Sequence, residues 1–341
     1  MTIPLAFVDD HPHAMSLSLF HCPGSIAFLD DDADYLQMLS LMLPDAWHVR
    51  LFVRAGDCLA QLQPESAQWE ADAWTQQQII DRWRQGATPL VPQVLQYWAG
   101  HAHSRYAMTH ACVADYSMPD MNGLQVLAEL SDWPGLRVLL TGQADEQIAV
   151  QAFNRALIDQ FLPKQAADVA ERLLSVLRSM PSNASARGSQ IWRATLNPVQ
   201  HAQLRAPAVA HALQAQIAAH GLVEHVVLGD PFGVLGRTAD GAVGWLQLEP
   251  VDGLEELEAL AETVGTDAAT LQEIRSGRQL IDLELRQALG RDDLPQLRPA
   301  FAIGDDALLG AYFPIDAALV PDVATSYAAW LAQQPARAVR R

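Results

Sequence analysis

Five side chains in this sequence have the types and the order that phosphoryl chemistry requires. Asp30 and Asp31 form an acid pair, Asp115 and Thr141 follow, and Lys164 is the single lysine among 341 residues. Carboxylates that crowd together repel one another and favour a hard cation such as Mg²⁺. A carboxylate can also act as a nucleophile, and an ammonium can contact a phosphoryl oxygen as a point charge. These residues predict a cation site that accepts a phosphoryl group.

The acids and the threonine each follow a short apolar run. Residues 25–29 precede the acid pair, residues 111–114 precede Asp115, and residues 136–140 precede Thr141. Helix-period segments follow most of these runs, which predicts an α/β fold with a doubly wound parallel sheet of five strands. The carboxyl ends of such strands share one edge, where ligands bind. The acids, the threonine and the lysine should therefore converge there.

Residues 24–180 resemble the receiver domain of two-component response regulators, which has a flavodoxin-like fold. Asp30 and Asp31 match the metal-binding acid pair of that family, and Asp115 matches its phosphoacceptor. The segment Met-Pro-Asp-Met-Asn-Gly at residues 118–123 matches the family turn M-P-x-M-[DN]-G. Agreement at several positions and spacings makes this a specific signal.

The resemblance also gives roles to residues after this turn. Thr141 matches the switch threonine, Lys164 the lysine that contacts the phosphate, and Phe161 the switch aromatic residue. It implies that Asp115 receives its phosphoryl group from a sensor histidine kinase or a phosphotransfer protein, and that the domain acts as a switch. The metal ligands that it implies for Mg²⁺ are Asp30, Asp31, Asp115 and Ser117.

Two departures from the family pattern concern the loops around the site. The residue after the family lysine is usually proline, but here it is Gln165, with Pro163 on the other side of Lys164. The usual cis Lys-Pro bond therefore cannot form. Ser117 and Gln143, each two positions beyond a site residue, border the attacking water in the family, so we expect them to influence the lifetime of the phosphate.

A second acid pair, Asp9 and Asp10, closes an apolar run near the N-terminus. Only a short segment separates it from residues 25–29, and no phosphoacceptor lies between them. We therefore take Asp30 and Asp31 as the site pair and residues 1–24 as an N-terminal arm. The start is acidic and lacks a sustained apolar core, so it does not have the pattern of a signal peptide.

The spacing from Asp30 to Asp115 is longer than a receiver domain needs, which predicts a helical insertion at about residues 64–107. It contains two helical patterns, with a break around Gly86 and Pro89. We expect it to leave the sheet at the edge opposite the phosphorylation site. It is then either an assembly element or packed on its own receiver domain.

The aromatic residues of this insertion suggest self-association. Among its large aromatic side chains are Trp69, Trp74, Trp83, Tyr97 and Trp98. If they were exposed, they would form a larger apolar surface than one receiver edge covers, and such patches usually mark interfaces. Two-fold pairing is the commonest arrangement, so a homodimer is expected.

Bulk composition agrees with a cytoplasmic signalling protein. The net charge of −18 and the pI near 4.8 argue against a broad nucleic-acid footprint. No apolar stretch is long enough to cross a membrane. Cys22, Cys58 and Cys112 are widely spaced and suit reduced, structural thiols.

After a last receiver helix at about residues 166–180, the turn-rich segment 181–189 is typical of a hinge, and helical linkers extend to residue 220. Residues 221–341 predict a small α+β output domain. Its strand-like runs lie at 224–228, 232–235, 243–248, 301–303 and 308–313, with a hairpin turn at 238–241 and helices at about 253–264, 267–276 and 279–289.

Several histidines are candidates for a functional role. His201 lies in a segment faintly similar to a kinase phosphohistidine box, and His101, His103 and His110 could be imagined as metal ligands. The box lacks its acid and no ATP-binding motif follows, while the other three lack a matching carboxylate or cysteine pattern. Plain helical and solvated histidines are the favoured interpretation.

We therefore expect a response regulator that accepts a phosphoryl group on Asp115 and is not an enzyme acting on another substrate. Its output domain, with 12 arginines against 19 acids in residues 185–341, is expected to bind protein. The alternatives are a transcription regulator with an unrecognised DNA reader and an enzyme effector. A clustered arginine face would favour the first, and a polar cleft with perturbed acids the second.

Overall fold

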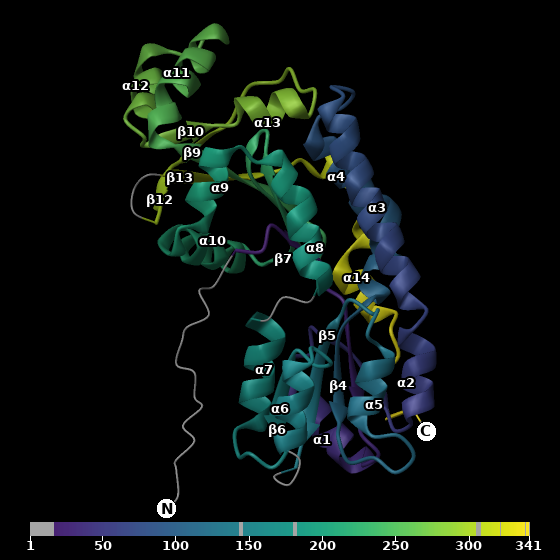
Figure 1. Ribbon diagram of the computed structural model, residues 1–341. Helices are drawn as coiled ribbons and strands as arrows, with labels where there is room; N and C mark the ends of the chain where they lie inside the picture. The colour runs from purple at the N-terminus through teal and green to yellow at the C-terminus, as the bar shows by residue number, and fades with distance from the viewer. Residues whose placement is uncertain are drawn as a thin grey trace, which may run out of the picture.

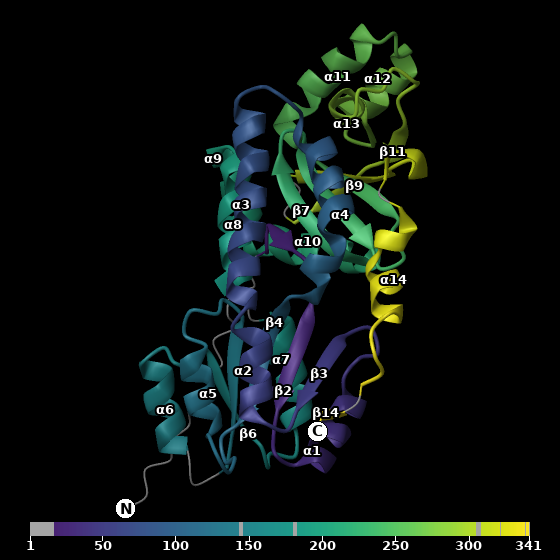
Figure 2. The same cartoon turned by 90° about the vertical axis from the view of Figure 1, so that its right-hand side faces the viewer.

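The computed structural model describes residues 17–142, 146–179, 183–304, 308–320, 322–337 and 339–340. Two lobes are stacked end to end (Figure 1), each built on a six-stranded sheet. The parallel lobe holds the strand order β14-β3-β2-β4-β5-β6, and the antiparallel lobe holds β1-β7-β8-β9-β13-β12. Two long helices, α3 and α4, run beside the antiparallel lobe and down toward the parallel one (Figure 2).

The parallel lobe confirms the predicted doubly wound sheet. Its five main strands pair in parallel throughout, and a short sixth strand, β14, is added beside β3. The strands are β2 (Ser25–Leu29), β3 (His48–Phe52), β4 (Thr109–Asp115), β5 (Leu136–Thr141), β6 (Gln160–Pro163) and β14 (Val339–Arg340). The helices around them are α1 (Ala33–Met42), α2 (Ala55–Leu62), α5 (Gly123–Glu129), α6 (Glu146–Asn154) and α7 (Val169–Ser179).

The strands of this sheet are apolar on both faces because helices cover both faces. Ala27 and Leu29 of β2 belong to one buried cluster, together with residues of α2 and α5. Ile26 and Phe28 of the same strand belong to a second cluster with residues of α1 and α7. This explains why the sequence shows continuous apolar runs here rather than an alternating pattern.

The antiparallel lobe forms from strands that lie mostly in the C-terminal half. They are β1 (Phe20–His21), β7 (Leu222–Gly229), β8 (Phe232–Thr238), β9 (Val243–Pro250), β12 (Phe301–Ile303) and β13 (Leu308–Pro314). The predicted turn between β8 and β9 is confirmed: Gly241 has a φ of 102°, and its N–H donates to the carbonyl of Thr238 at 3.1 Å. Such a positive φ favours glycine.

A smaller unit extends from this sheet. It contains α11 (Leu254–Thr263), α12 (Ala268–Arg275), β10 (Gln279–Ile281), α13 (Leu283–Ala288) and β11 (Leu297–Pro299). The predicted helix at 279–289 is wrong in its first part, because residues 279–281 pair with β11. Asp282 ends the strand: its buried carboxylate accepts from Arg286 Nε at 3.0 Å and from the backbone N–H of Gln296.

The insertion consists of α3 (Glu65–Arg84) and α4 (Leu90–Ala107). As expected, it joins the sheet opposite the carboxyl edge, since α4 ends just before β4 begins. Trp69, near the start of α3, packs into the core of the receiver sheet, but most of the remaining apolar face packs against the antiparallel lobe, in the same core as Trp245. Neither interpretation made from the sequence included this partner.

The aromatic surface that suggested a homodimer is mostly internal. Trp69, Tyr97 and Trp98 are buried, and Trp83 is half-buried against the core of the antiparallel lobe. Trp74 is the exception, with 65% of its surface exposed. The premise of a large exposed aromatic patch is therefore wrong, and the homodimer itself remains a prediction without this support.

The predicted hinge at 181–189 differs from the structure. Residues 183–192 form helix α8 (Asn183–Trp192), and 181–182 lie outside the described residues. Helix α8 packs along α3, where Trp192 is fully buried and its indole N–H donates to Gln76 Oε1 at 2.9 Å. A 3-10 turn, α9 (Pro198–Arg205) and α10 (Pro207–Ala219) then lead into β7.

Both ends of the described chain connect the two lobes. Phe20 and His21, within the predicted N-terminal arm, form β1 and pair with β7 of the antiparallel lobe. At the other end, α14 (Tyr327–Ala332) packs against α4, and the chain then returns to the parallel lobe as β14 (Figure 2). The lobes are thus joined by several chain segments.

An arginine from the C-terminal segment completes the parallel lobe. The guanidinium of Arg337 donates to the backbone carbonyls of Ser40 at 2.7 Å, Leu43 at 3.0 Å and Trp47 at 3.0 Å, and also to that of Pro44. The carbonyls of Ser40 and Leu43 lie at the end of α1, where a helix leaves carbonyls without internal partners, and those of Pro44 and Trp47 lie in the turn toward β3. The C-terminal segment therefore satisfies a turn in a distant part of the sequence.

Some expectations fall outside the described residues, namely the second acid pair at Asp9 and Asp10, residue Gln143, and part of the β12–β13 turn. Among the helices that the structure describes, none combines the length and the apolarity needed to cross a membrane.

Candidate functional site

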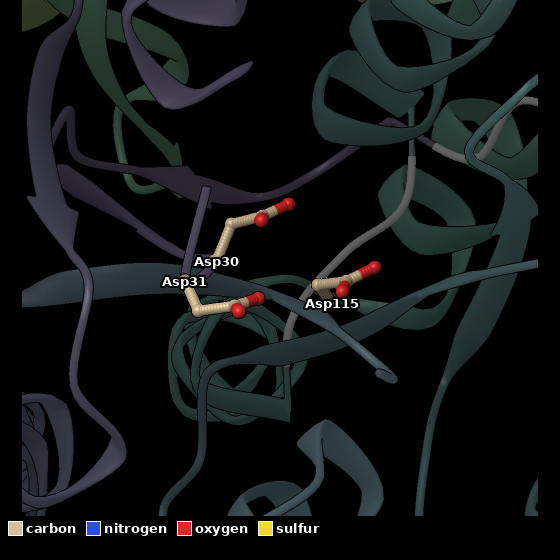
Figure 3. A group of neighbouring side chains, drawn as sticks. All are labelled: Asp30, Asp31 and Asp115. Atoms are coloured by element: carbon tan, nitrogen blue, oxygen red, sulfur yellow. The ribbon is translucent and has the colours of Figure 1, made fainter. Parts of the chain in front are cut away.

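The candidate site lies where β2 and β4 end, at the carboxyl edge of the parallel sheet. Asp30 and Asp31 follow β2, Asp115 closes β4, and their side chains point the same way (Figure 3). One carboxylate oxygen from each of the three lies within 4.8 Å of the others. Asp30 and Asp115 are buried and Asp31 is exposed. Three converging carboxylates match the oxygen ligands that Mg²⁺ prefers, so these residues could hold that ion.

The third acid of the run has a separate, local role. Asp32 is the N-cap of α1, and its carboxylate accepts from the backbone N–H groups of Asp34 and Tyr35, each at 3.0 Å. Its own N–H donates to Asp30 Oδ1 at 3.0 Å. Capping begins the helix directly after the acid pair and fixes the backbone that carries Asp30. The run of three acids is therefore two site residues and a helix cap.

The turn after Asp115 is fixed by its glycine and its asparagine. A Cβ at position 123 would lie 2.1 Å from the carbonyl oxygen of Asp115, so the close approach requires Gly123. Asn122 caps α5, and its side chain and that of Gln125 satisfy each other's backbone N–H groups. This geometry turns the chain sharply, and it leaves Ser117 exposed two residues after Asp115.

Lys164 reaches both acids from the end of β6. Its Nζ lies 2.6 Å from Asp30 Oδ2 and 3.3 Å from Asp115 Oδ1. Its backbone N–H donates to the carbonyl of Thr141 at 2.9 Å. Among the described residues the cis peptide is Asp230–Pro231, so the bond from Lys164 to Gln165 is trans. The lysine therefore reaches the site without the cis proline bond of the family pattern.

Thr141 and Phe161 occupy neighbouring positions on the sheet. Thr141 ends β5 and is buried, 1% exposed. Phe161 lies on the adjacent strand β6, half-buried against the cluster that also contains Leu139. The structure thus brings together Asp30, Asp31, Asp115 and Lys164, with Thr141 at the end of the strand beside Asp115.

Burial and charge act against each other inside the site. Burial raises the pKa of Asp30, and the hydrogen bond from Lys164 opposes only part of that rise. Burial by itself would lower the pKa of Lys164, but Asp30 and Asp115 together leave that pKa above its ordinary value. Lys164 is therefore held as an ammonium, the form that can contact a phosphoryl oxygen.

Sequence reasoning missed Tyr35, which lies against this lysine. Lys164 Nζ is 4.4 Å from the centre of the Tyr35 ring. The one available signal was the position of Tyr35 in the first turn of the helix that follows the acid pair. No local pattern indicates that its ring faces the end of β6.

The histidines do not join the site. His110 is half-buried, with its ring 4.9 Å from that of Trp69, and desolvation lowers its pKa to about 3. His101 and His103 are exposed near the end of α4. In the part of the chain that the structure describes, the three aspartates are the one group of potential metal ligands that converges.

No family model matches the sequence, and no curated protein matches it. The structure is similar to that of the response regulator LqsR from Legionella pneumophila, with a TM-score of 0.67 and 21% identity, over 94% of this chain and 97% of that chain. At this identity the likeness shows a shared fold, which extends over both lobes. The predicted receiver fold with an additional C-terminal α+β region is confirmed.

Two further structures cover half of the chain. One is an adenylate cyclase from Rhodopirellula baltica, with 17% identity and a TM-score of 0.31, over 50% of this chain and 92% of that one. The other is a CheY-like receiver domain protein from Methanospirillum hungatei, with 16% identity and a TM-score of 0.31, over 50% and 99%. Scores of this size carry no argument about function.

Proposed function

We propose that this protein is a response regulator of a two-component system and that Asp115 is its phosphoacceptor. The observation that carries the proposal is the contact of Lys164 with both Asp30 and Asp115 at the carboxyl edge of a receiver-type sheet. A structural ion pair would need one carboxylate, whereas this lysine contacts two carboxylates that belong to a converging group of three. A sensor histidine kinase or a phosphotransfer protein would supply the phosphoryl group.

In the proposed reaction, a carboxylate oxygen of Asp115 attacks the phosphorus of the donor. A new oxygen–phosphorus bond forms while the bond from phosphorus to the donor's leaving atom breaks, and the electron pair of that bond leaves with the donor. Lys164 is already held as an ammonium 3.3 Å from Asp115, so it can take up charge on a phosphoryl oxygen without a proton transfer. The hydroxyl of Thr141 can donate a hydrogen bond to another phosphoryl oxygen.

The acid cluster fits Mg²⁺ as its cofactor. Asp30, Asp31 and Asp115 would hold the ion, with Ser117 contributing at the turn, because all three acids present hard oxygen donors toward one point. A bound Mg²⁺ would supply positive charge that offsets the repulsion between the carboxylates and the incoming phosphoryl group. Asp31, which is exposed, also leaves one side of the site open to the donor.

The phosphorylated state would be relayed by a local switch. Movement of Thr141 toward the phosphoryl group would free space for Phe161 to turn inward, since the two lie on adjacent strands and Phe161 pairs with Leu139, two residues before Thr141. The antiparallel lobe would then carry the output, by binding a protein partner. The alternative of DNA binding gains no specific support, because the described arginines of this lobe are mostly paired with acids. Of the features that an effector enzyme would show, raised carboxyl pKa values occur at Glu249 and Glu284, with burial as the main cause.

Phosphorylation of intact protein by a small phosphodonor tests this proposal. With Mg²⁺ and acetyl phosphate, the wild-type chain should gain the mass of one acid-labile phosphoryl group, and Asp115→Asn should gain none. Asp120→Asn is the matched control, since Asp120 is an exposed acid in the same loop. Asp31→Ala should abolish the Mg²⁺-dependent phosphorylation, because it removes one of the three proposed ligands of the ion.

Asp115→Asn labelled to the wild-type yield would refute the assignment of the phosphoacceptor. A wild-type chain that gains no mass from acetyl phosphate or from any phosphorylated histidine donor would refute the wider proposal.

A further inference from the structure

Tyr35 lies beside the reactive groups but belongs to none of the roles described above. It occupies the first turn of α1, where its backbone N–H donates to the capping carboxylate of Asp32 at 3.0 Å. The face of its ring lies 4.4 Å from Lys164 Nζ. Its hydroxyl is buried and has no hydrogen-bond partner among the residues that the structure describes.

The Lys164 ammonium contacts three side chains. Asp30 and Asp115 approach it as ion-pair partners, and the Tyr35 ring covers it as an aromatic face. A cation over such a face is attracted by the negative charge density of the ring. A lysine stem is flexible, and holding it in one rotamer costs conformational entropy. A third contact reduces the number of rotamers open to the side chain.

We infer that Tyr35 is a positioning residue, whose ring holds the Lys164 ammonium against Asp30 and Asp115. The helix that carries the ring is held at both ends, because α1 begins at the Asp32 cap and its far end is bound by Arg337. Burial raises the pKa of the phenol, and the charges of the same lysine and acids also act on it, which agrees with a position facing the site. Tyr35 does not react.

The single lysine of this chain allows a direct test in the full-length protein. Selective isotope labelling of lysine gives one set of side-chain NMR signals, all from Lys164. In the wild type, the ring of Tyr35 should shift the Hε signal upfield. Tyr35→Phe keeps the ring and should keep that shift, whereas Tyr35→Leu should lose it and show averaged rotamers.

A second test rests on the proposed function and measures the initial rate of Asp115 phosphorylation by acetyl phosphate. Loss of a cation–π contact of about 1 kcal/mol corresponds to about a fivefold slower rate in Tyr35→Leu, with Tyr35→Phe close to wild type. In a Lys164→Met background, Tyr35→Leu should cause no further loss, because the lysine through which it acts is gone.

The outcomes distinguish the positioning role of Tyr35 from the proposed phosphorylation of Asp115. Tyr35→Leu slowing both backgrounds equally would mean a merely structural role, and Tyr35→Phe behaving like Tyr35→Leu would assign the effect to the hydroxyl. Either result overturns the inference while Asp115 phosphorylation stands. If the wild type takes no phosphoryl group, the proposed function fails and the NMR comparison alone decides: an Hε signal unchanged in Tyr35→Leu refutes the positioning of Lys164.

Discussion

A buried ion pair between the insertion and the antiparallel lobe gives the sharpest prediction about stability. Arg105 of α4 is bound to Glu224 of β7, and the two side chains are 1% and 0% exposed. The second carboxylate oxygen of Glu224 accepts from the hydroxyl of Tyr106 at 2.8 Å. Glu224→Gln would leave the Arg105 guanidinium buried beside a neutral amide.

The expected loss follows from the cost of an unpaired buried charge. Removing one partner of a buried pair costs about 3–5 kcal/mol, because the remaining charge keeps its desolvation penalty without its attraction. The exposed pair of Arg187 and Glu70 is the matched control, with side chains 48% and 67% exposed. Glu70→Gln should cost about 0–1 kcal/mol, since water screens such pairs.

Urea unfolding followed by circular dichroism measures both free energies. A double variant, Arg105→Met with Glu224→Met, tests the cause: removing both charges should recover most of the loss caused by Glu224→Gln. The reasoning is refuted if Glu224→Gln destabilises no more than Glu70→Gln, or if the double variant is as unstable as the single one.

Two further predictions concern the C-terminal segment and an acid of β9. Arg337→Ala should destabilise the protein by about 2 kcal/mol and speed hydrogen exchange along β3, because four backbone carbonyls lose a charged donor. Arg337→Lys should recover little of this stability, since an ammonium lacks the fork of a guanidinium. Equal exchange along β3 in all three chains would contradict this. Burial, together with Glu284 and other acids, raises the pKa of Glu249 to about 7. The folded state therefore keeps a proton on Glu249 at pH values where the unfolded state has already lost it. The free energy of unfolding should fall as the pH rises toward 7. Glu249→Gln should therefore be more stable than wild type by about 2 kcal/mol near pH 8 and nearly equal to it below the ordinary pKa of glutamate, as thermal unfolding at several pH values would show.

The parallel sheet and the members of its site could be predicted from the sequence because both depend on local patterns. Strands buried on two faces require apolar runs, and the residue that ends each run must lie at the carboxyl edge. This is why Asp115 and Thr141 are found where the sequence places them. Tyr35 could not be predicted in this way, because its contact with Lys164 joins positions far apart in the chain.

The amphipathic pattern of residues 64–107 determined that one face of each helix is buried, but it could not determine what covers that face. The tertiary structure decided this by placing α3 and α4 against the antiparallel lobe, because that lobe offers the complementary apolar surface around Trp245. The same holds for the ends of the chain. The short strands Phe20–His21 and Val339–Arg340 carry almost no pattern of their own, and they form because β7 and β3 present open hydrogen-bonding edges.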